Sequence, residues 1–328
     1  MTVRIGTRAS KLALTQTQQT ADKLAAVGGF GVDLVHIKTE GDVKTGSLSQ
    51  MGGTGVFVAA LRDALLADVC DVAVHSLKDL PTGAALGLSI AATPKRVDVR
   101  DVLCARDGMT LAQLPEGAKV GTGSPRRAAQ LRAARPDLEV LDIRGNVDTR
   151  LGRVSGLPGN TTDAVVPGKS CDLDAVVLAA AGLERMGRLD TVSEYFETGV
   201  MLPAPGQGAL AIECRTDEAP QAEGSNGVLA QALAALNDDD TRLAVTAERA
   251  VLARLEAGCA APVGAYAFRK GSMLHLEAAV CAVDGSTTVR EKKATDGLTE
   301  VGATLLGIEV AELLLAAGAA EIADLAAS

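Results

Sequence analysis

Short apolar runs alternate with longer amphipathic segments along the first hundred residues. The runs predict strands at residues 3–8, 32–39, 71–75 and 90–92. The amphipathic segments predict helices at residues 11–28 and 57–66. Ser10 stands where it would cap the first helix, and Gly28 and Gly29 are typical of its end.

The same alternation restarts after Pro94, where charged residues gather between 95 and 101 and predict a crossing between two domains. Further strands are predicted from Val120 and at 139–143, 174–179 and 209–214. Helices are predicted at 126–134 and from Gly182. The segment MLPAPGQG at 201–208 predicts a second crossing.

The last third of the chain predicts a long helix at 240–256, and then strands near 263–269, 274–283 and 286–291. A final helix is predicted over 297–317. Strands that alternate with helices predict an α/β fold with parallel sheets. In such folds ligands bind at the carboxyl ends of strands, often between domains.

The length of 328 residues predicts two or three domains, and 47% hydrophobic residues are enough to build their cores. Only two Tyr and four Phe are aromatic, Trp is absent, and the formal net charge is -9. Proteins that grip single-stranded nucleic acid use aromatic stacking and a basic surface. We therefore expect no nucleic-acid partner.

The sequence shows no sign of a membrane span, a secretion signal or a metal site. The first residues, MTVRIGTRAS, are polar, and the apolar stretches end well short of the roughly 18 residues of a span. None of the six cysteines belongs to a C-x-x-C pair, and the three histidines are scattered. We expect a cytoplasmic protein with reduced thiols and no metal.

Seven arginines and no lysine lie between residues 126 and 153, together with four acidic residues, so the local charge is 7 − 4 = +3. Arginine is the planar, bidentate partner of carboxylates and phosphates. The segment 121–127 is predicted to run from a strand end into a helix start, where free N–H groups also bind anions. These features predict an anion site, although a solvated helix face would also explain Arg132 and Arg135.

The motif HSLKDLP at 75–81 follows a predicted buried strand and places Lys78 and Asp79 directly at its end. A carboxylate in that position could stabilise a developing cation or move a proton. A local Lys–Asp pair on the surface is the alternative interpretation. Cys259 lies between small residues and is either a covalent attachment point or an inert apolar residue.

Seven segments, in this order, resemble the porphobilinogen deaminase family of tetrapyrrole biosynthesis, and they span most of the chain. They are IGTRASKLAL (5–14), HSLKDLP (75–81), GTGSPRRAAQL (121–131), IRGNVDTRL (143–151), AAAGLERMG (179–187), LPAPGQGALAIECR (202–215) and AERAVLARLEAGCAAPVGAYA (247–267). The resemblance implies an α/β fold of three domains. Two would be lobes like those of type II periplasmic-binding proteins, and the third a smaller C-terminal α/β domain.

By the resemblance, we expect the first domain to comprise residues 1–98 together with 203–222. The second domain would comprise residues 99–202 and the third residues 223–328. A glycine-rich segment at 41–55 is expected to be a mobile surface loop of the first domain. The segment 155–172 lies between the motifs and is expected to be an insertion in the second domain.

The resemblance also implies a dipyrromethane cofactor, which is two linked pyrroles held by a thioether on Cys259. Four molecules of porphobilinogen would be condensed head to tail with release of ammonia, and water would then free hydroxymethylbilane. Porphobilinogen is the partner implied, and we expect a monomer. The enzyme class implied is a transferase of haem biosynthesis.

Asp79 matches the catalytic carboxylate of the family, which would stabilise the positive charge left when ammonia departs. The resemblance implies that the cofactor is bound by Cys259, Lys78, Ser124, Arg126, Arg127 and Arg150. It implies that the substrate is bound by Arg8, Ser10, Phe57, Arg144 and Arg185. Two loop lysines that are usual in the family are replaced here by Thr54 and Ala59.

The main alternative is a non-catalytic two-lobed protein that binds an anion or another solute. Such a protein would carry a secretion signal and would need neither Cys259 nor a third domain. A regulator's effector domain with the same lobes is a further alternative. It would need a helix-turn-helix segment before the lobes, where the sequence predicts a strand instead.

Overall fold

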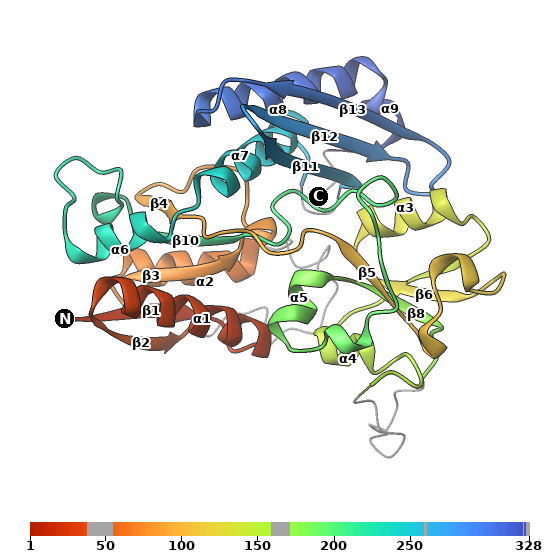
Figure 1. Ribbon diagram of the computed structural model, residues 1–328, viewed down its shortest axis with the longest axis horizontal. Coiled ribbons are helices and arrows are strands. Elements are labelled where there is room, and N and C mark those ends of the chain that lie inside the picture. The colour runs from red at the N-terminus through yellow and green to blue at the C-terminus, as the bar shows by residue number, and fades with distance from the viewer. Residues whose placement is uncertain (38–54, 159–170, 259–260, 324, 326–328) are drawn as a thin grey trace.

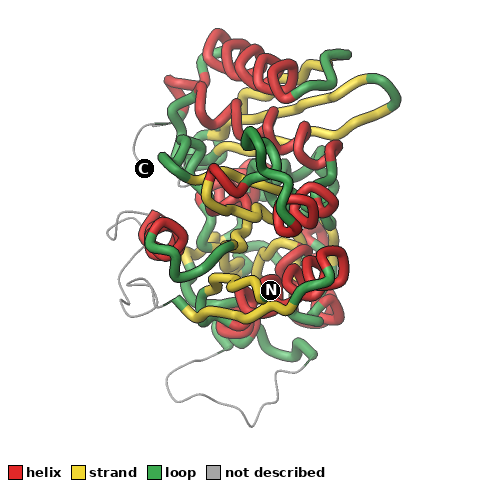
Figure 2. The backbone as a smooth tube through the Cα atoms, turned by 90° about the vertical axis from the view of Figure 1, so that its left-hand side faces the viewer, coloured by secondary structure: helices red, strands yellow, loops and turns green. Residues whose placement is uncertain are grey.

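The computed structural model (Figure 1) describes residues 1–37, 55–158, 171–258, 261–323 and 325, with the backbone alone at 55–57. Within these residues, the chain forms two five-stranded sheets and one three-stranded sheet. Each sheet has its own covering helices. Figure 1 and Figure 2 both show the part built on the third sheet lying above the two larger lobes.

The first lobe is built on a mixed sheet with the strand order β2-β1-β3-β10-β4. Its strands are β1 (Thr2–Thr7), β2 (Gly31–His36), β3 (Val72–Ser76), β4 (Leu88–Ala92) and β10 (Leu210–Arg215). Its helices are α1 (Lys11–Gly28), α2 (Gly55–Leu66) and α6 (Val228–Leu236). Ser10 caps α1 by accepting the N–H of Ala13, and Gly29 ends it with a φ of 65°.

The second lobe is built on a mixed sheet with the strand order β7-β6-β8-β5-β9. Its strands are β5 (Asp101–Ala105), β6 (Lys119–Thr122), β7 (Glu139–Asp142), β8 (Ala175–Ala179) and β9 (Glu194–Tyr195). Its helices are α3 (Pro125–Ala134), α4 (Val147–Leu151) and α5 (Ala180–Arg185). Pro125 stands in the first turn of α3, where its missing N–H costs nothing.

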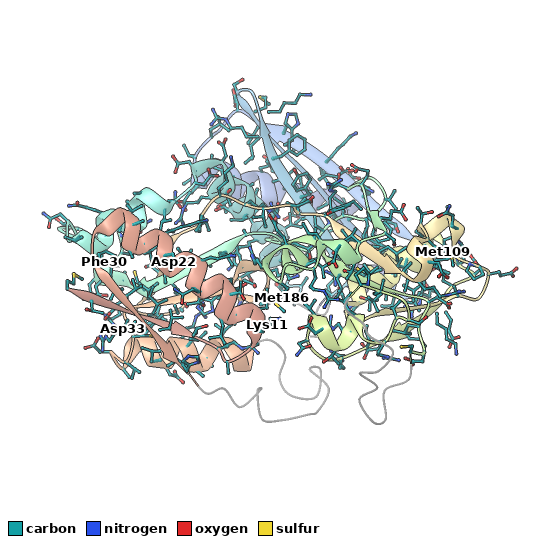
Figure 3. The ribbon with its side chains drawn as sticks, turned by 60° about the horizontal axis from the view of Figure 1, so that its bottom comes forward. Lys11, Asp22, Phe30, Asp33, Met109 and Met186 are labelled. Atoms are coloured by element: carbon teal, nitrogen blue, oxygen red, sulfur yellow. The ribbon has the colours of Figure 1, made fainter. Side chains whose placement is uncertain are left out.

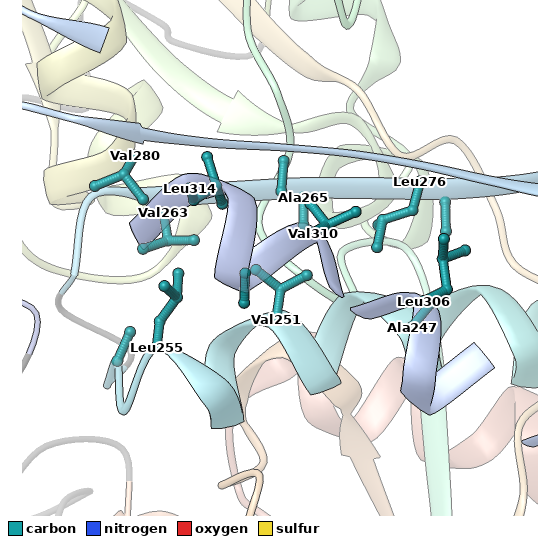
Figure 4. Packing of buried hydrophobic residues seen from close by; sticks show 14 of the residues in the cluster. Ala247, Val251, Leu255, Val263, Ala265, Leu276, Val280, Leu306, Val310 and Leu314 are labelled. Atoms are coloured by element: carbon teal, nitrogen blue, oxygen red, sulfur yellow. The ribbon is translucent and has the colours of Figure 1, made fainter. Parts of the chain in front are cut away.

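The third sheet is an antiparallel meander of β11 (Val263–Lys270), β12 (Met273–Cys281) and β13 (Thr288–Thr295). One face is covered by α7 (Asp239–Arg254) and α8 (Glu300–Ala316), with the short α9 (Ala319–Ile322) at the edge. Alternate side chains of β12 point into this layer, as Figure 4 shows for Leu276 and Val280. They pack there against Val251 of α7 and Val310 of α8.

Single turns of 3-10 helix connect several of these elements. They are η2 (Leu77–Asp79), η3 (Arg106–Gly108), η4 (Leu111–Gln113), η5 (Leu189–Thr191) and η6 (Thr216–Glu218). None of the helices in the described parts of the chain is long and apolar enough to cross a bilayer.

Two segments join the lobes. The first crossing, residues 93–100, runs from β4 to β5, and the second crossing, residues 202–209, returns from the second lobe to β10. The two crossings touch where the N–H of Val97 donates to the carbonyl of Gly208 at 3.4 Å. Because β10 pairs with β3 and β4, the first lobe is assembled from two separate stretches of chain.

The predicted α/β fold of two lobes and a smaller C-terminal domain is confirmed. The predicted strands and helices are all present, with ends that shift by a few residues. The expectation of parallel sheets holds for β1 with β2 and β3 and for β6 with β7 and β8. It is wrong for β5 and β10, which run antiparallel to their neighbours, and for the third sheet, which is wholly antiparallel. Short connections between consecutive strands permit only antiparallel pairing, as between β11 and β12.

Five helices and strands were not predicted, namely β5, β9, α4, α6 and α9. Strand β5 begins inside the charged cluster that indicated only a crossing, yet all five of its residues are buried. Helix α6 follows residue 223, where the third domain was expected to begin, but it packs against α1 and β4 of the first lobe. Its Leu229 and Leu233 share one core with Leu24.

Candidate active site

The predicted site residues follow the carboxyl ends of parallel strands in both lobes. Arg8 follows β1, and Lys78 and Asp79 follow β3. In the second lobe, Ser124, Arg126 and Arg127 follow β6, and Arg144 follows β7. Helix α5, which carries Arg185, follows β8 directly. In Figure 3, Lys11 of α1 and Met186 beside α5 lie close together at the middle of the molecule, where α1 contacts α5.

The end of β3 presents a lysine and a carboxylate on the single turn η2. Asp79 is exposed, and its side chain has no ion pair or hydrogen bond within the described part of the chain. Lys78 is half-buried, and its Nζ donates to Oε1 of Gln207 at 3.3 Å. Burial and the neighbouring Arg127 lower the pKa of Lys78 to about 8, although Asp79 and Asp101 act in the opposite direction. The alternative of a surface Lys–Asp pair is therefore wrong, since Lys78 faces the second lobe.

The first turn of α3 buries two arginines against one carboxylate. Arg126 and Arg127 are 3% and 5% exposed, and both contact Asp101, which is completely buried at the start of β5. Arg126 Nη1 lies 2.7 Å from Oδ2 of Asp101, and Arg127 Nε lies 2.8 Å from Oδ1. Burial opposes ionisation of Asp101, but the two guanidinium groups outweigh it and hold its pKa below the usual range. A solvated helix face does not describe these two residues.

A second pair of arginines extends the positive charge toward the end of β7. Arg150 of α4 donates from Nε to the carbonyl of Gly145 at 2.9 Å, and Arg144 pairs with Asp142 at 3.0 Å. Burial lowers the pKa of Arg150, and its neighbours Arg127 and Arg144 lower it further. Positive charges therefore lie close enough together to repel one another.

The start of α1 in the first lobe and Arg185 in the second lobe lie at the edge of the candidate site. Ser10 and Arg8 precede this helix, and the Ser10 hydroxyl is used in the helix cap. Arg185 reaches from α5 to the first lobe and to the second crossing, donating to Oε1 of Gln16 at 3.4 Å and to the carbonyl of Gly208 at 3.0 Å. Burial lowers the pKa of Arg185. Arg185 thus joins both lobes at the edge of the site.

Three predicted features fall outside what the structure describes. Cys259 lies outside the described residues, as does the glycine-rich segment except for Gly55, and as does most of the insertion at 155–172. Phe57 belongs to α2, and its side chain is not described. Ser124 is placed as the N-cap of α3, where its Oγ accepts the N–H of Arg127 at 3.5 Å.

Three residues that sequence reasoning missed organise this region. Asp101 balances the two buried arginines, and Gln207 in the second crossing contacts Lys78 of the first lobe and Asp101 of the second. Arg249 of α7 donates to the carbonyls of Leu80 and Pro81, directly after Asp79. The sequence around Gln207 and around Asp101 gives no indication of these contacts, because the residues that they contact lie far away in the sequence.

The charges of the site fit a ligand that carries carboxylates. Lys78, Arg126, Arg127 and Arg150 bring four positive charges, whereas Asp101 and Asp79 bring two negative charges. Nε of Arg126 is buried and has no hydrogen-bond partner among the described residues. A ligand that carries several carboxylates would supply the missing negative charge and further acceptors. No group of metal-ligating side chains is present in the described parts of the chain.

Comparison with known families agrees with this chemistry. Residues 3–223 match the family model "Porphobilinogen deaminase, dipyromethane cofactor binding domain", and residues 242–316 match the model of the C-terminal domain of porphobilinogen deaminase. The chain belongs to the porphobilinogen deaminase family. The resemblance implied by the seven sequence motifs is thereby confirmed.

Relatives named porphobilinogen deaminase match over almost the whole chain. One from Cutibacterium acnes is 56% identical over 99% of this chain and 98% of that protein. One from Leifsonia xyli is 52% identical over 98% of this chain and 94% of that protein. Among solved structures, a periplasmic substrate-binding protein of an ABC transporter from Coxiella burnetii is 16% identical. The match covers 71% of this chain and 91% of the Coxiella burnetii chain, with a TM-score of 0.42.

Proposed function

We propose that this chain is a hydroxymethylbilane synthase that condenses four porphobilinogen molecules head to tail, releases four molecules of ammonia and frees a linear tetrapyrrole with water. The observation that carries the proposal is the group of buried and half-buried cations beside Asp79, at facing strand ends of the two lobes. Each pyrrole of the product has an acetate and a propionate. A site with excess positive charge stabilises such an oligomer as it lengthens.

The residues that would hold a dipyrromethane are Cys259, Lys78, Ser124, Arg126, Arg127 and Arg150. The group supplies, when bound, the pyrrole end to which new units are joined. Arg127 and Arg150 come from two different helices and are kept close despite mutual repulsion, which is the arrangement expected for binding several carboxylates. Their planar guanidinium groups fix a carboxylate in two places, so Arg127→Lys is not a conservative change.

Asp79 is proposed as the catalytic residue. Departure of ammonia from porphobilinogen leaves positive charge shared with the pyrrole nitrogen. The exposed Asp79 carboxylate can accept the pyrrole N–H and stabilise that charge, and it can receive the proton released when the new bond forms. Arg249 supports this role because it holds the two carbonyls that follow Asp79.

Arg8, Ser10, Phe57, Arg144 and Arg185 are proposed to bind incoming porphobilinogen. Arg144 is exposed, and its partner Asp142 is also on the surface, so a substrate carboxylate can replace it at little cost. Arg185 lies between α1 and the second crossing, where substrate bound to one lobe would meet the other.

The division into domains is proposed with one change from the expected boundaries. Residues 1–98 with 203–236 would form the first domain, 99–202 the second and 237–328 the third. Helix α6 belongs with the first domain because its core is shared with α1. We therefore begin the third domain near Asn237, just before α7.

The proposal is tested by intact-protein mass spectrometry of freshly made protein together with a porphobilinogen assay. We expect a mass excess equal to two pyrrole units, its loss in Cys259→Ser, and production of hydroxymethylbilane by the unaltered chain alone. Cys171→Ser is the matched control, because Cys171 is exposed and its thiol donates weakly to the carbonyl of Gly152. A protein that binds porphobilinogen without consuming it, and carries no added mass, would show the solute-binding alternative to be right.

The proposal includes a monomeric cytoplasmic protein with porphobilinogen as its small-molecule partner. Light scattering on the purified chain tests the first point, with a mass near 33.4 kDa expected for the polypeptide. Cell fractionation tests the second point.

A further inference from the structure

The side chain of Gln207 lies between the two lobes and is completely buried. Its Oε1 accepts from Nζ of Lys78 at 3.3 Å and from Nη2 of Arg127 at 3.4 Å. Its Nε2 donates to the carbonyl of Val99 at 2.8 Å and to Oδ1 of Asp101 at 2.9 Å. One carboxamide therefore connects the first lobe, the second lobe and both crossings.

These four contacts require a side chain that accepts hydrogen bonds with one atom and donates them with another. The partners on one side, Lys78 and Arg127, can only donate, and the partners on the other side, Val99 O and ionised Asp101, can only accept. Glutamine is the uncharged side chain of this length that satisfies both sides. A glutamate would turn one carboxylate oxygen toward Asp101 and the Val99 carbonyl, where no proton separates them.

The backbone around Gln207 holds it in this position. Gly206 and Gly208 have φ angles of 77° and 86°, a region that favours glycine. The N–H of Gly206 donates to Oε2 of Glu248 at 2.6 Å, and a Cβ added to Gly208 would lie 2.8 Å from the carbonyl of Val97. The segment is therefore fixed to α7 on one side and to the first crossing on the other.

We propose that Gln207 is a positioning residue that holds the Lys78 ammonium and the Arg127 guanidinium on one neutral oxygen, so that both cations remain available to the same bound carboxylates. An acid in this place would form ion pairs with them and reduce their attraction for a ligand. A carboxamide aligns the two cations and adds no negative charge to that of Asp101, which already pairs with Arg127. The inference rests on the proposed function and extends the proposed roles of Lys78 and Arg127 to a completely buried residue between the lobes.

The protonation of Lys78 provides a test that needs no substrate. The charged groups that face Lys78 are Arg126, Arg127, Asp79 and Asp101, and the pKa of Lys78 is about 8. The pH dependence of Lys78 acylation, followed on its peptide by mass spectrometry, reports this pKa. In Gln207→Glu the added negative charge should move the midpoint up by about one pH unit or more. In Gln207→Met the ammonium loses an acceptor, so the midpoint should move down.

Gln130 provides a matched control. It is also buried, and it joins α3 to the second crossing through the N–H and the carbonyl of Leu202, with no contact to Lys78. Gln130→Glu should lower stability without moving the Lys78 midpoint. An unchanged midpoint in both Gln207 variants would overturn the proposal, as would an equal shift in Gln130→Glu.

Turnover provides a second measurement, made at a temperature at which thermal unfolding shows each variant to be folded. Gln207→Met should lower kcat/KM for porphobilinogen about tenfold or more, mainly through KM, since transition-state groups are left in place. In a Lys78→Met background the same change should cost less than about threefold, because its effect passes in part through Lys78. Losses that multiply fully in the double variant would refute the proposal. An inactive unaltered chain would instead count against the proposed function and leave the labelling result to decide this one.

Discussion

The carboxylate of Asp79 is exposed at the end of β3 and makes no ion pair or hydrogen bond within the described residues. Its removal should therefore cost little folding free energy, within about 0.5 kcal/mol. We expect Asp79→Asn to keep the fold and to lose turnover by about 10² or more, because the amide cannot stabilise the developing positive charge. Steady-state kinetics and thermal unfolding measure the two effects.

Asp33→Asn is the control for that experiment. Asp33 is also an exposed aspartate, but it lies on the edge strand β2, away from the meeting point of the lobes, as Figure 3 shows. It should retain both stability and turnover. Near-normal turnover in a folded Asp79→Asn protein would show that the carboxylate has no catalytic role.

The lowered pKa of Lys78 predicts that kcat/KM for porphobilinogen depends on pH. Its pKa is lowered to about 8, so the ammonium loses its charge at a lower pH than an ordinary lysine. Since the charged form attracts carboxylates, kcat/KM for porphobilinogen should fall as the pH rises through about 8. In Lys78→Arg the charge persists over this range, and the fall should disappear. If kcat/KM of the Lys78→Arg protein still falls near pH 8, a group other than Lys78 causes the pH dependence.

At the scale of elements, α7 and α8 pack so closely that a glycine is required between them. A Cβ added to Gly307 of α8 would lie 2.3 Å from the carbonyl of Ala247 and 2.5 Å from Cβ of Ala250, both on α7. Gly307→Ala should force the helices apart and reduce the free energy of unfolding by about 1–3 kcal/mol. Denaturant titration measures the change.

The same substitution at Gly182 of α5 should have the opposite effect on stability. An added Cβ there would meet no heavy atom within 4 Å. Gly182→Ala should stabilise the protein by about 0.4–1 kcal/mol, since alanine reduces the freedom of the unfolded chain. A Gly307→Ala protein as stable as the Gly182→Ala protein would show that α8 can move away from α7 without cost.

At the scale of the whole molecule, one carboxylate ties the third domain to both crossings. Glu248 of α7 is fully buried and accepts from Arg96 at 2.6 and 2.9 Å, from the N–H of Gly206 at 2.6 Å and from the N–H of Ala267 at 2.8 Å. Arg96 belongs to the first crossing, Gly206 to the second and Ala267 to β11. All acceptor sites of this carboxylate face a donor.

Glu248→Gln should be strongly destabilising because it leaves the charge of Arg96 buried without a counter-ion. We expect a loss of about 3–5 kcal/mol in the free energy of unfolding. Glu312→Gln is the control, since its pair with Arg254 at 2.6 Å is exposed and should contribute at most about 1 kcal/mol. Equal losses in the two variants would mean that the buried ion pair does not hold the three parts together.

Much of the fold could be predicted from local patterns. The amphipathic period of α1, with Ser10 before it and Gly29 after it, contains its own start and stop signals. Strand β5 could not be predicted in the same way, because a buried strand that opens with Asp101 resembles a charged linker until its two arginine partners are known. The antiparallel course of β10 was also hidden, since it depends on the chain returning from the second lobe.

By itself, the sequence determined the α/β class, the positions of most helices and strands and, through seven ordered motifs, the family and the candidate residues. These depend on neighbours in the chain, whose spacing and chemistry are visible in one dimension. Only the tertiary structure decided that Arg126 and Arg127 share Asp101, that Gln207 joins Lys78 to Arg127, and that α6 belongs to the first lobe. Those contacts form between residues far apart in the chain, where burial and charge are set by how the sheets and helices pack.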